Sequence, residues 1–299
     1  MFDRALVFLH IPKTGGSTMR NIFSRLYSGG TVFTISVPSP KGIAEFKRLP
    51  CEFRLTIDVL QGHMGFGLHE YLRKPCVYFT MLRDPIDRVV SRYYYELSKR
   101  PRPAYMYRCP NEASETLTLE DYVSSGINKL VDNGMTRLLS ASDGKIYDVP
   151  FGQCSRSMLD EAIKNLENHF LAFGILADFD ESLILLKRAM GCRFPFYVRR
   201  RVTQSRPDQA DISDSARQTV SALNELDIEL YDWARQRLKI EIDEQGPGFQ
   251  AELILFGFLN KILGGAYTMA RWIDRWLVSD HRAATSRRGS SVTRQAQLD

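Results

Sequence analysis

The chain has 299 residues, of which 44% are hydrophobic and 25% charged, so it can bury a full core and is neither a disordered nor a fibrous sequence. Its net charge of +5 suits an anionic ligand or an ordinary solvated surface, and the basic residues form no aromatic-studded stripe of the kind that binds nucleic acid. The five cysteines are widely spaced, without CxxC or HExxH patterns, which argues against a disulfide framework or zinc site and favours a reducing compartment. Because the first strand is expected from about residue 5, we expect no secretory signal or N-terminal anchor, and hence a cytoplasmic protein.

The first unit is an apolar strand over residues 5–9, a tight loop with the sequence His-Ile-Pro-Lys-Thr-Gly-Gly over residues 10–16, and a helix with apolar residues at helical spacing to Leu26. Lys13 and the free N–H groups at the helix start predict an anion-binding loop, with Ser17 or Thr18 as the N-cap. The alternative is a glycine turn with an exposed lysine. The lysine precedes the two glycines here, whereas it follows the second glycine in the G-x-x-x-x-G-K-[ST] pattern of nucleotide triphosphatases.

A second strand is expected over residues 53–60, after an irregular stretch, and it leads into a glycine-rich loop over residues 61–67. His63 lies in that loop, at the carboxyl end of the strand, where ligands collect in open α/β sheets. It is a candidate functional residue, although a single histidine is more often structural. His10 either lines the same site or packs beneath it.

The third unit is a buried strand over residues 76–82 followed at once by Arg83, with Asp84 as N-cap and Pro85 as first residue of a helix. Ser91 lies two turns into this helix. An arginine at a strand tip beside a helix hydroxyl suits a second phosphate. The alternative is that Arg83 pairs with Asp84 or Asp87 as a structural clamp.

Further along, a capping box at Thr118 opens a short helix, and another helix follows Asn133. Asn133 and Arg137 either face an acceptor or lie on a solvated helix face. A helix over residues 157–168, a strand over 170–176 and a helix over 179–190 continue the alternation. It predicts an α/β protein with a P-loop-like three-layer fold, in which helices flank a central, mostly parallel sheet.

Two later segments stand apart in composition. Residues 199–206 are the densest basic cluster and form either a loop over an anionic ligand or a disordered surface loop. After a Gly-Pro-Gly break we expect a domain at residues 1–245 to end and an amphipathic helical extension with a polar, disordered tail to occupy 246–299. The apolar stretch of this extension, residues 253–270, is expected either to lie on a membrane surface as a peripheral contact or to pack on the same domain.

Taken together, residues 10–18, Gln61-Gly62-His63 and the run Arg83-Asp84-Pro85-x-x-Arg88-x-x-Ser91 resemble sulfotransferases that use 3'-phosphoadenosine-5'-phosphosulfate (PAPS), within the carbohydrate branch of uronyl 2-O-sulfotransferases and bacterial relatives. The resemblance implies a catalytic base at His63, a phosphate-stabilising role for Lys13, and substrate contacts from Asn133 and Arg137. The cofactor-binding residues that it implies are Lys13, Thr14, Gly15, Gly16, Ser17, Thr18, Arg83, Ser91, Arg200 and Arg201.

The function implied by this resemblance is transfer of a sulfuryl group from PAPS to a hydroxyl of a carbohydrate or glycolipid, without a metal. One alternative is a P-loop kinase or triphosphatase, which would turn over ATP with magnesium. The other is a non-catalytic, nucleotide-binding adaptor at a membrane, for which the extension would matter and His63 would not. The sequence does not indicate an oligomeric state.

Overall fold

The fold is built on a five-stranded parallel sheet with the strand order β2-β3-β1-β4-β5. The computed structural model describes residues 4–35, 40–99, 101, 103–106, 116–145, 148–192, 196–198 and 212–263. The strands are β1 (Ala5–Leu9), β2 (Thr31–Ile35), β3 (Ile57–Gly62), β4 (Cys76–Leu82) and β5 (Phe170–Ile175). The predicted parallel sheet is therefore confirmed, and the carboxyl ends of β1, β3 and β4 meet at one edge.

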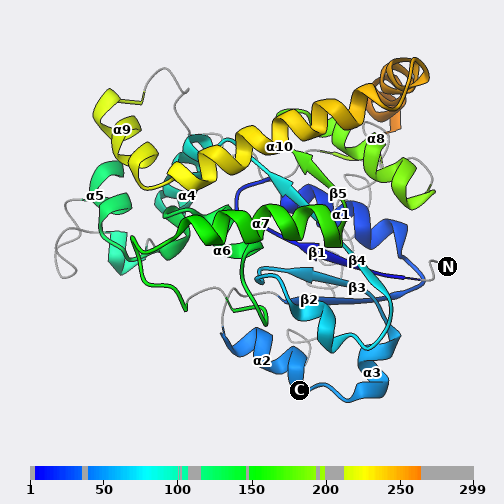
Figure 1. Ribbon diagram of the computed structural model, residues 1–299, viewed down its shortest axis with the longest axis horizontal. Helices are drawn as coiled ribbons and strands as arrows, with labels where there is room; N and C mark the ends of the chain where they lie inside the picture. Colours follow the sequence, from blue (N-terminus) through cyan, green and yellow to red (C-terminus); the bar gives the residue numbers. More distant parts are fainter. Residues whose placement is uncertain are drawn as a thin grey trace, which may run out of the picture.

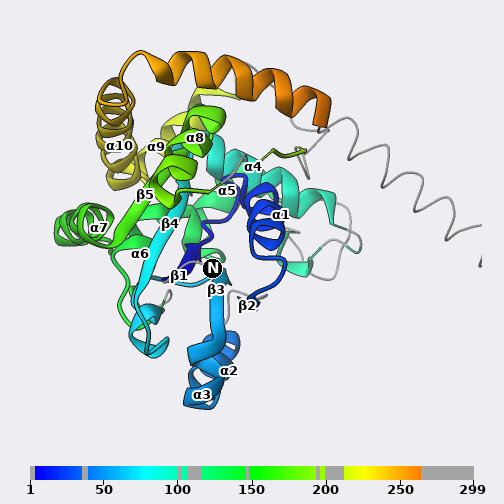
Figure 2. The same ribbon diagram turned by 90° about the vertical axis from the view of Figure 1, so that its right-hand side faces the viewer.

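Helices cover both faces of this sheet and make the predicted three layers, as Figures 1 and 2 show. They are α1 (Gly16–Leu26), α2 (Pro40–Arg48), α3 (Cys51–Thr56), α4 (Pro85–Ser98), α5 (Leu119–Ser124), α6 (Gly134–Leu139), α7 (Arg156–His169), α8 (Phe179–Met190), α9 (Asp214–Ala222) and α10 (Glu225–Asp243). Short 3-10 helices lie at Leu68–Tyr71, Ala104–Met106 and Lys129–Val131.

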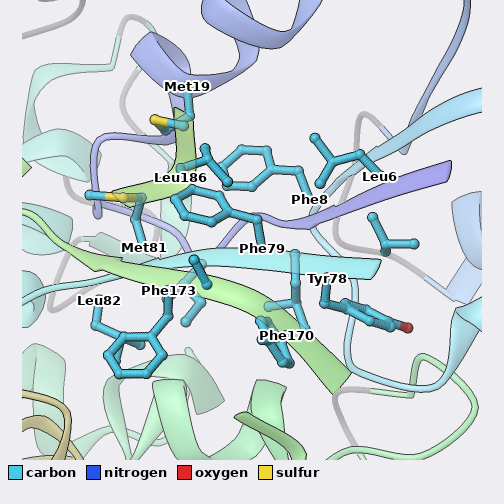
Figure 3. Close-up of a cluster of buried hydrophobic side chains, with 14 of the residues drawn as sticks. Leu6, Phe8, Met19, Tyr78, Phe79, Met81, Leu82, Phe170, Phe173 and Leu186 are labelled. Carbon is cyan, nitrogen blue, oxygen red and sulfur yellow. The ribbon is translucent and has the colours of Figure 1, made fainter. Parts of the chain in front are cut away.

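The two faces of the sheet can be told apart by their aromatic contacts. Phe8 of β1 and Phe79 of β4 pack against Phe23 of α1, with ring centroids 5.2 and 5.9 Å apart. On the opposite face, Phe173 of β5 lies 5.7 Å from Trp233 of α10. Figure 3 shows these strand side chains filling the core on either side of the sheet. Alternate residues of a strand point to opposite faces, so each strand contributes side chains to the packing on both faces of the sheet.

The sequence prediction was wrong at the second strand. The structure has a short helix, α3, where residues 53–56 were expected to be extended, and β3 begins only at Ile57. Pro50 precedes this helix, and the apolar side chains of Phe53 and Leu55 remain exposed, so their alternation did not mark a buried strand. The stretch expected to be irregular contains β2 and α2.

The chain turns after α10, where the domain boundary is expected, and a new helix runs from residue 248 to 263 within the described residues. Its inward face belongs to the main core: Phe249 and Phe256 are fully buried, and Glu252 forms ion pairs with Lys187 and Arg188 of α8. The start of the extension therefore packs back on the domain. Among the described residues, no helix is both long and apolar enough to cross a membrane.

Candidate functional site

The loop between β1 and α1 has the geometry of an anion-binding loop. Lys13 and Gly15 have positive φ angles of 73° and 82°, so the backbone makes a tight turn before the helix starts. The Thr14 hydroxyl stabilises this turn by donating to the Ile11 carbonyl at 2.8 Å. The N–H groups of Gly16 and Ser17, at the first two positions of α1, have no acceptor within a helix and can bind an anion. The Thr18 N–H instead donates to the Gly15 carbonyl at 2.9 Å.

The cap of α1 differs from the sequence prediction. Gly15 is the N-cap, without a side-chain hydrogen bond, and Ser17 and Thr18 lie inside the first turn. Only a residue that tolerates a positive φ can occupy position 15, and a Cβ there would also meet Leu176 at 2.8 Å. The two hydroxyls are therefore not used as caps, and their predicted contact with a cofactor stays a prediction.

Arg83 joins this loop to the next strand. Its guanidinium donates to the Lys13 carbonyl at 2.9 Å and to Asp87 at 3.2 Å, whereas Asp84 caps α4 by accepting from the Asp87 N–H, as predicted. The predicted clamp is thus present through Asp87. Arg83 nevertheless lies beside the loop, at the tip of β4, where a second phosphate was expected.

The helix α4 carries the predicted Ser91 and a set of side chains that the sequence prediction missed. Ser91 is almost fully buried. The Lys13 ammonium lies 4.4 Å from the centroid of the Tyr95 ring, and Lys99 and Arg92 lie 5.1 and 5.9 Å from the same centroid. Arg92 and Tyr95 share one face of α4, and Lys99 follows directly as its C-cap residue, so the spacing along the sequence was a signal that could have identified them.

His63 lies at the same edge of the sheet as the loop. The His10 N–H donates to the Gly62 carbonyl at 3.0 Å, which holds the ends of β1 and β3 together. The His63 Nδ1 lies 3.1 Å from the His10 carbonyl oxygen, and the two imidazole rings stack at 4.3 Å. A carbonyl only accepts hydrogen bonds, so Nδ1 carries the proton and Nε2 has a free lone pair.

The environment keeps this imidazole neutral. Burial lowers the pKa of His63 to about 4, the hydrogen bond to His10 opposes the shift, and the positive charges of Arg92 and Arg20 add to it. At neutral pH the side chain is therefore a proton acceptor. A general base needs this state, provided that a substrate hydroxyl comes within hydrogen-bond reach.

The two predicted substrate residues, Asn133 and Arg137, both form hydrogen bonds within the protein, and their predicted contact with an acceptor stays a prediction. Arg137 is almost fully buried and donates to the carbonyl oxygens of Asp132, Val149 and Pro150 at 2.7, 2.8 and 2.9 Å, and to the Asp132 carboxylate. Asn133 donates to Asp132 and accepts at 3.0 Å from the backbone of the first turn of α10. The solvated-face alternative is wrong because both side chains are buried, and their geometry gives no support to a substrate contact.

The remaining predicted residues are Arg200 and Arg201, and they lie outside the described residues. Within the ranges that the structure describes, no three His, Cys, Asp or Glu side chains are grouped so that they could hold a metal ion.

Known proteins that are similar to this chain include carbohydrate sulfotransferases of low sequence identity. Mouse heparan-sulfate 6-O-sulfotransferase 3 is 25% identical over 271 residues, which cover 77% of this chain and 56% of the relative. Human galactose-3-O-sulfotransferase 2 is 24% identical over 258 residues, with coverage of 79% and 62%. A crystal structure of mouse sulfotransferase SULT7A1 complexed with PAP has 14% identity and a TM-score of 0.35, and covers 74% of this chain and 64% of that one.

The chain thus spans a little over half the length of the mouse heparan-sulfate enzyme. A family model described as galactose-3-O-sulfotransferase matches residues 3–252, and the chain therefore belongs to the galactose-3-O-sulfotransferase family.

Proposed function

We propose that this protein transfers a sulfuryl group from PAPS to a carbohydrate hydroxyl. The observation that carries the proposal is the position of His63: a partly buried, neutral imidazole, fixed by the His10 carbonyl, lies at the sheet edge that also bears the anion-binding loop. Membership of a sulfotransferase family supports the same reaction, and the named relatives act on heparan sulfate and galactose.

The side chains and N–H groups at this edge fit a nucleotide with two phosphate positions. Around the loop, the first turn of α1 and the Lys13 ammonium would hold the 5'-phosphosulfate, and Arg83 with Ser91 would hold the 3'-phosphate. Each of these groups is either a cation or a neutral hydrogen-bond donor, and both kinds of group suit a phosphate. PAPS, when bound, supplies the sulfuryl group and remains as the 3',5'-bisphosphate PAP.

Each residue of the site then has a chemical role. The His63 Nε2 accepts the proton of the acceptor hydroxyl, while Nδ1 keeps its hydrogen bond to the His10 carbonyl. The Lys13 ammonium and the N–H groups of the loop stabilise negative charge on the leaving phosphate. Because these groups are already oriented by the fold, they need little rearrangement during the reaction.

Calorimetric titration with PAP tests the cofactor assignment. We expect wild-type protein to bind PAP with a Kd of about a micromolar without magnesium. MgATP should bind much more weakly, because ATP has no 3'-phosphate for Arg83 to bind. Arg83→Ala should weaken PAP binding by roughly tenfold or more, the usual effect of losing a charged hydrogen bond.

The matched control is Asp87→Asn, which removes the ion pair with Arg83 but keeps the guanidinium. If Arg83 contacts the nucleotide, PAP affinity in this variant stays within about threefold of wild type. Equal losses in both variants would mean that Arg83 acts only as a clamp.

We further propose that the extension brings this site to a membrane surface, where a glycolipid acceptor would be found, with the protein on the cytoplasmic face. Five large apolar side chains of the helix from residue 248, here called the apolar row, are exposed: Ile254 at 75%, Phe258 at 62%, Ile262 at 52%, Leu255 at 49% and Leu263 at 39%. Lys261 lies among them. Such a row is typical of helices that lie in the bilayer interface.

Co-flotation with vesicles of anionic phospholipid tests this contact. The double variant Ile254→Ser with Phe258→Ser should reduce the bound fraction by roughly tenfold or more, because each apolar side chain contributes about 1.5–3 kcal/mol when buried. Ile240→Ser is the control, since Ile240 is also exposed but lies on α10, outside the row. Equal flotation of wild type and the double variant would contradict the proposal.

A further inference from the structure

His10 is a buried polar side chain with an unsatisfied ring nitrogen among the described residues. The residue is only 7% exposed, and within the described residues its Nδ1 has no hydrogen-bond partner. Leaving a buried polar nitrogen unsatisfied costs about 1–3 kcal/mol, which an apolar side chain at this position would avoid. The requirement for an imidazole here therefore does not come from folding alone.

The ring contacts the candidate base directly. Phe8, His10 and His63 form a column of stacked rings, with centroids 5.5 Å apart between the first two and 4.3 Å between the last two, and interplanar angles of 11° and 28°. Phe8 is anchored in the core against α1 (Figure 3). The column thus runs from the core of the protein to the edge of the sheet where His63 lies.

The other edge of the His10 ring touches the start of α1. A Cβ added at Gly16 would lie 1.8 Å from the His10 Nε2, so the ring fits only because position 16 is a glycine. A six-membered ring would extend further toward the helix than imidazole does. Position 10 therefore holds a flat, five-membered ring between the anion-binding loop and His63.

We propose that His10 is a positioning residue, whose ring and carbonyl group together hold His63 in one orientation and one tautomer with Nε2 as proton acceptor. The inference rests on the proposed function, in which His63 is the base. It assigns to His10 no contact with the reacting atoms. The loop that would bind the nucleotide and the base that would accept the proton are thereby joined through one buried imidazole.

The electrostatic surroundings agree with this assignment. Burial holds the pKa of His10 well below its ordinary value, and His63, Arg20 and Lys13 lower it further. The charged groups that act on His63 are Arg20 of α1 and Arg92 of α4. Both rings therefore stay neutral at neutral pH, and burial is the largest cause for each. Removing the His10 ring would let water reach His63 and would therefore reduce the desolvation that lowers the pKa of His63.

Histidine NMR on the protein without ligands tests the proposal independently of activity. With labelled histidine, and His63→Ala to assign the signal, we expect wild-type His63 to be the Nδ1–H tautomer and to remain neutral down to about pH 5. In His10→Ala the titration midpoint should rise by at least about one pH unit, toward the ordinary value. An unchanged midpoint, or an Nε2–H tautomer in the wild type, would overturn the proposal.

A double-mutant cycle tests the contact itself. Gly16→Ala alone should lower the melting temperature, because the new methyl group displaces the His10 ring. In the His10→Ala background the same change should have a clearly smaller effect. Equal effects in both backgrounds would contradict the geometry. If His10→Ala does not fold, Gly16→Ala takes its place in the NMR titration, where it should raise the His63 midpoint for the same reason.

The proposed function and the positioning role of His10 can be rejected independently of each other. Absence of sulfuryl transfer by the wild type would reject the proposed function and leave the NMR result standing. A wild type that transfers the sulfuryl group while His10→Ala leaves the His63 midpoint unmoved would reject only the positioning role of His10.

Discussion

We expect His63→Ala to lower kcat for sulfuryl transfer about a thousandfold, within the range that a positioned general base contributes. The reason is that His63 is the neutral imidazole at the edge of the sheet next to the loop, with its Nε2 lone pair free. The Kd for PAP should stay within about threefold of the wild-type value, because no predicted phosphate contact involves this ring. Single-turnover transfer and calorimetry measure the two quantities.

His69→Ala is the matched control for this variant. His69 is also partly buried, but it bonds to the Tyr78 hydroxyl at 3.0 Å, near the start of β4 and away from the strand tip that bears Arg83. Its loss should change kcat by less than about threefold. If His63→Ala retained full activity, or if both variants lost activity equally, His63 could not be the base.

The largest expected effect on stability belongs to Asp227→Ala. Asp227 and Arg88 are buried and form an ion pair at 3.1 Å, and the same carboxylate accepts from the N–H groups of Met135 and Thr136 at 2.9 and 2.7 Å. Its removal leaves a buried guanidinium without its counter-charge, at a cost of about 3–5 kcal/mol. Thermal unfolding should show a melting temperature lower by roughly 10 °C.

Glu229→Ala provides the comparison on the same helix. Glu229 pairs with Arg156 at 2.5 Å, but both side chains are largely exposed, and such surface pairs contribute about 0–1 kcal/mol. The melting temperature of this variant should stay close to that of the wild type. Similar losses in the two variants would mean that the buried network has no special role in holding α4, α6 and α10 together.

The sequence predicts much of the fold because several elements carry strong local signals. The buried apolar strands β1 and β4 and the helix α8 have the predicted bounds, and Asp84 and Thr118 are the expected caps. The signals fail where tertiary context decides. The strand β2 is only partly buried along most of its length, so it has neither a continuous apolar run nor a clear alternation.

The site could be predicted only in part, for a different reason. Glycines, a lysine and a strand end locate the loop and His63, because those features depend on backbone geometry. The partners of a side chain depend on elements far apart in sequence. Arg137 is buried against a loop more than ten residues away, and Arg83 pairs with both the loop and α4. No local pattern contains these contacts.

The comparisons support a carbohydrate sulfotransferase, but not the particular branch of that group that the motifs suggest. The family shown is the galactose-3-O-sulfotransferase family, and the relatives described above include a heparan-sulfate 6-O-sulfotransferase. The narrower expectation of a bacterial, uronyl 2-O-type enzyme stays a prediction. The position of the acceptor hydroxyl is therefore best sought with galactose-terminated and heparan-type acceptors side by side.

The most direct test of the central claim is transfer of ³⁵S from labelled PAPS to these two kinds of acceptor by the wild-type protein. We expect label on at least one acceptor, with one PAP released for each sulfuryl group transferred and with no requirement for ATP. PAPS that remains intact with every acceptor, together with hydrolysis of MgATP by the same preparation, would contradict it and favour a kinase-like or triphosphatase activity.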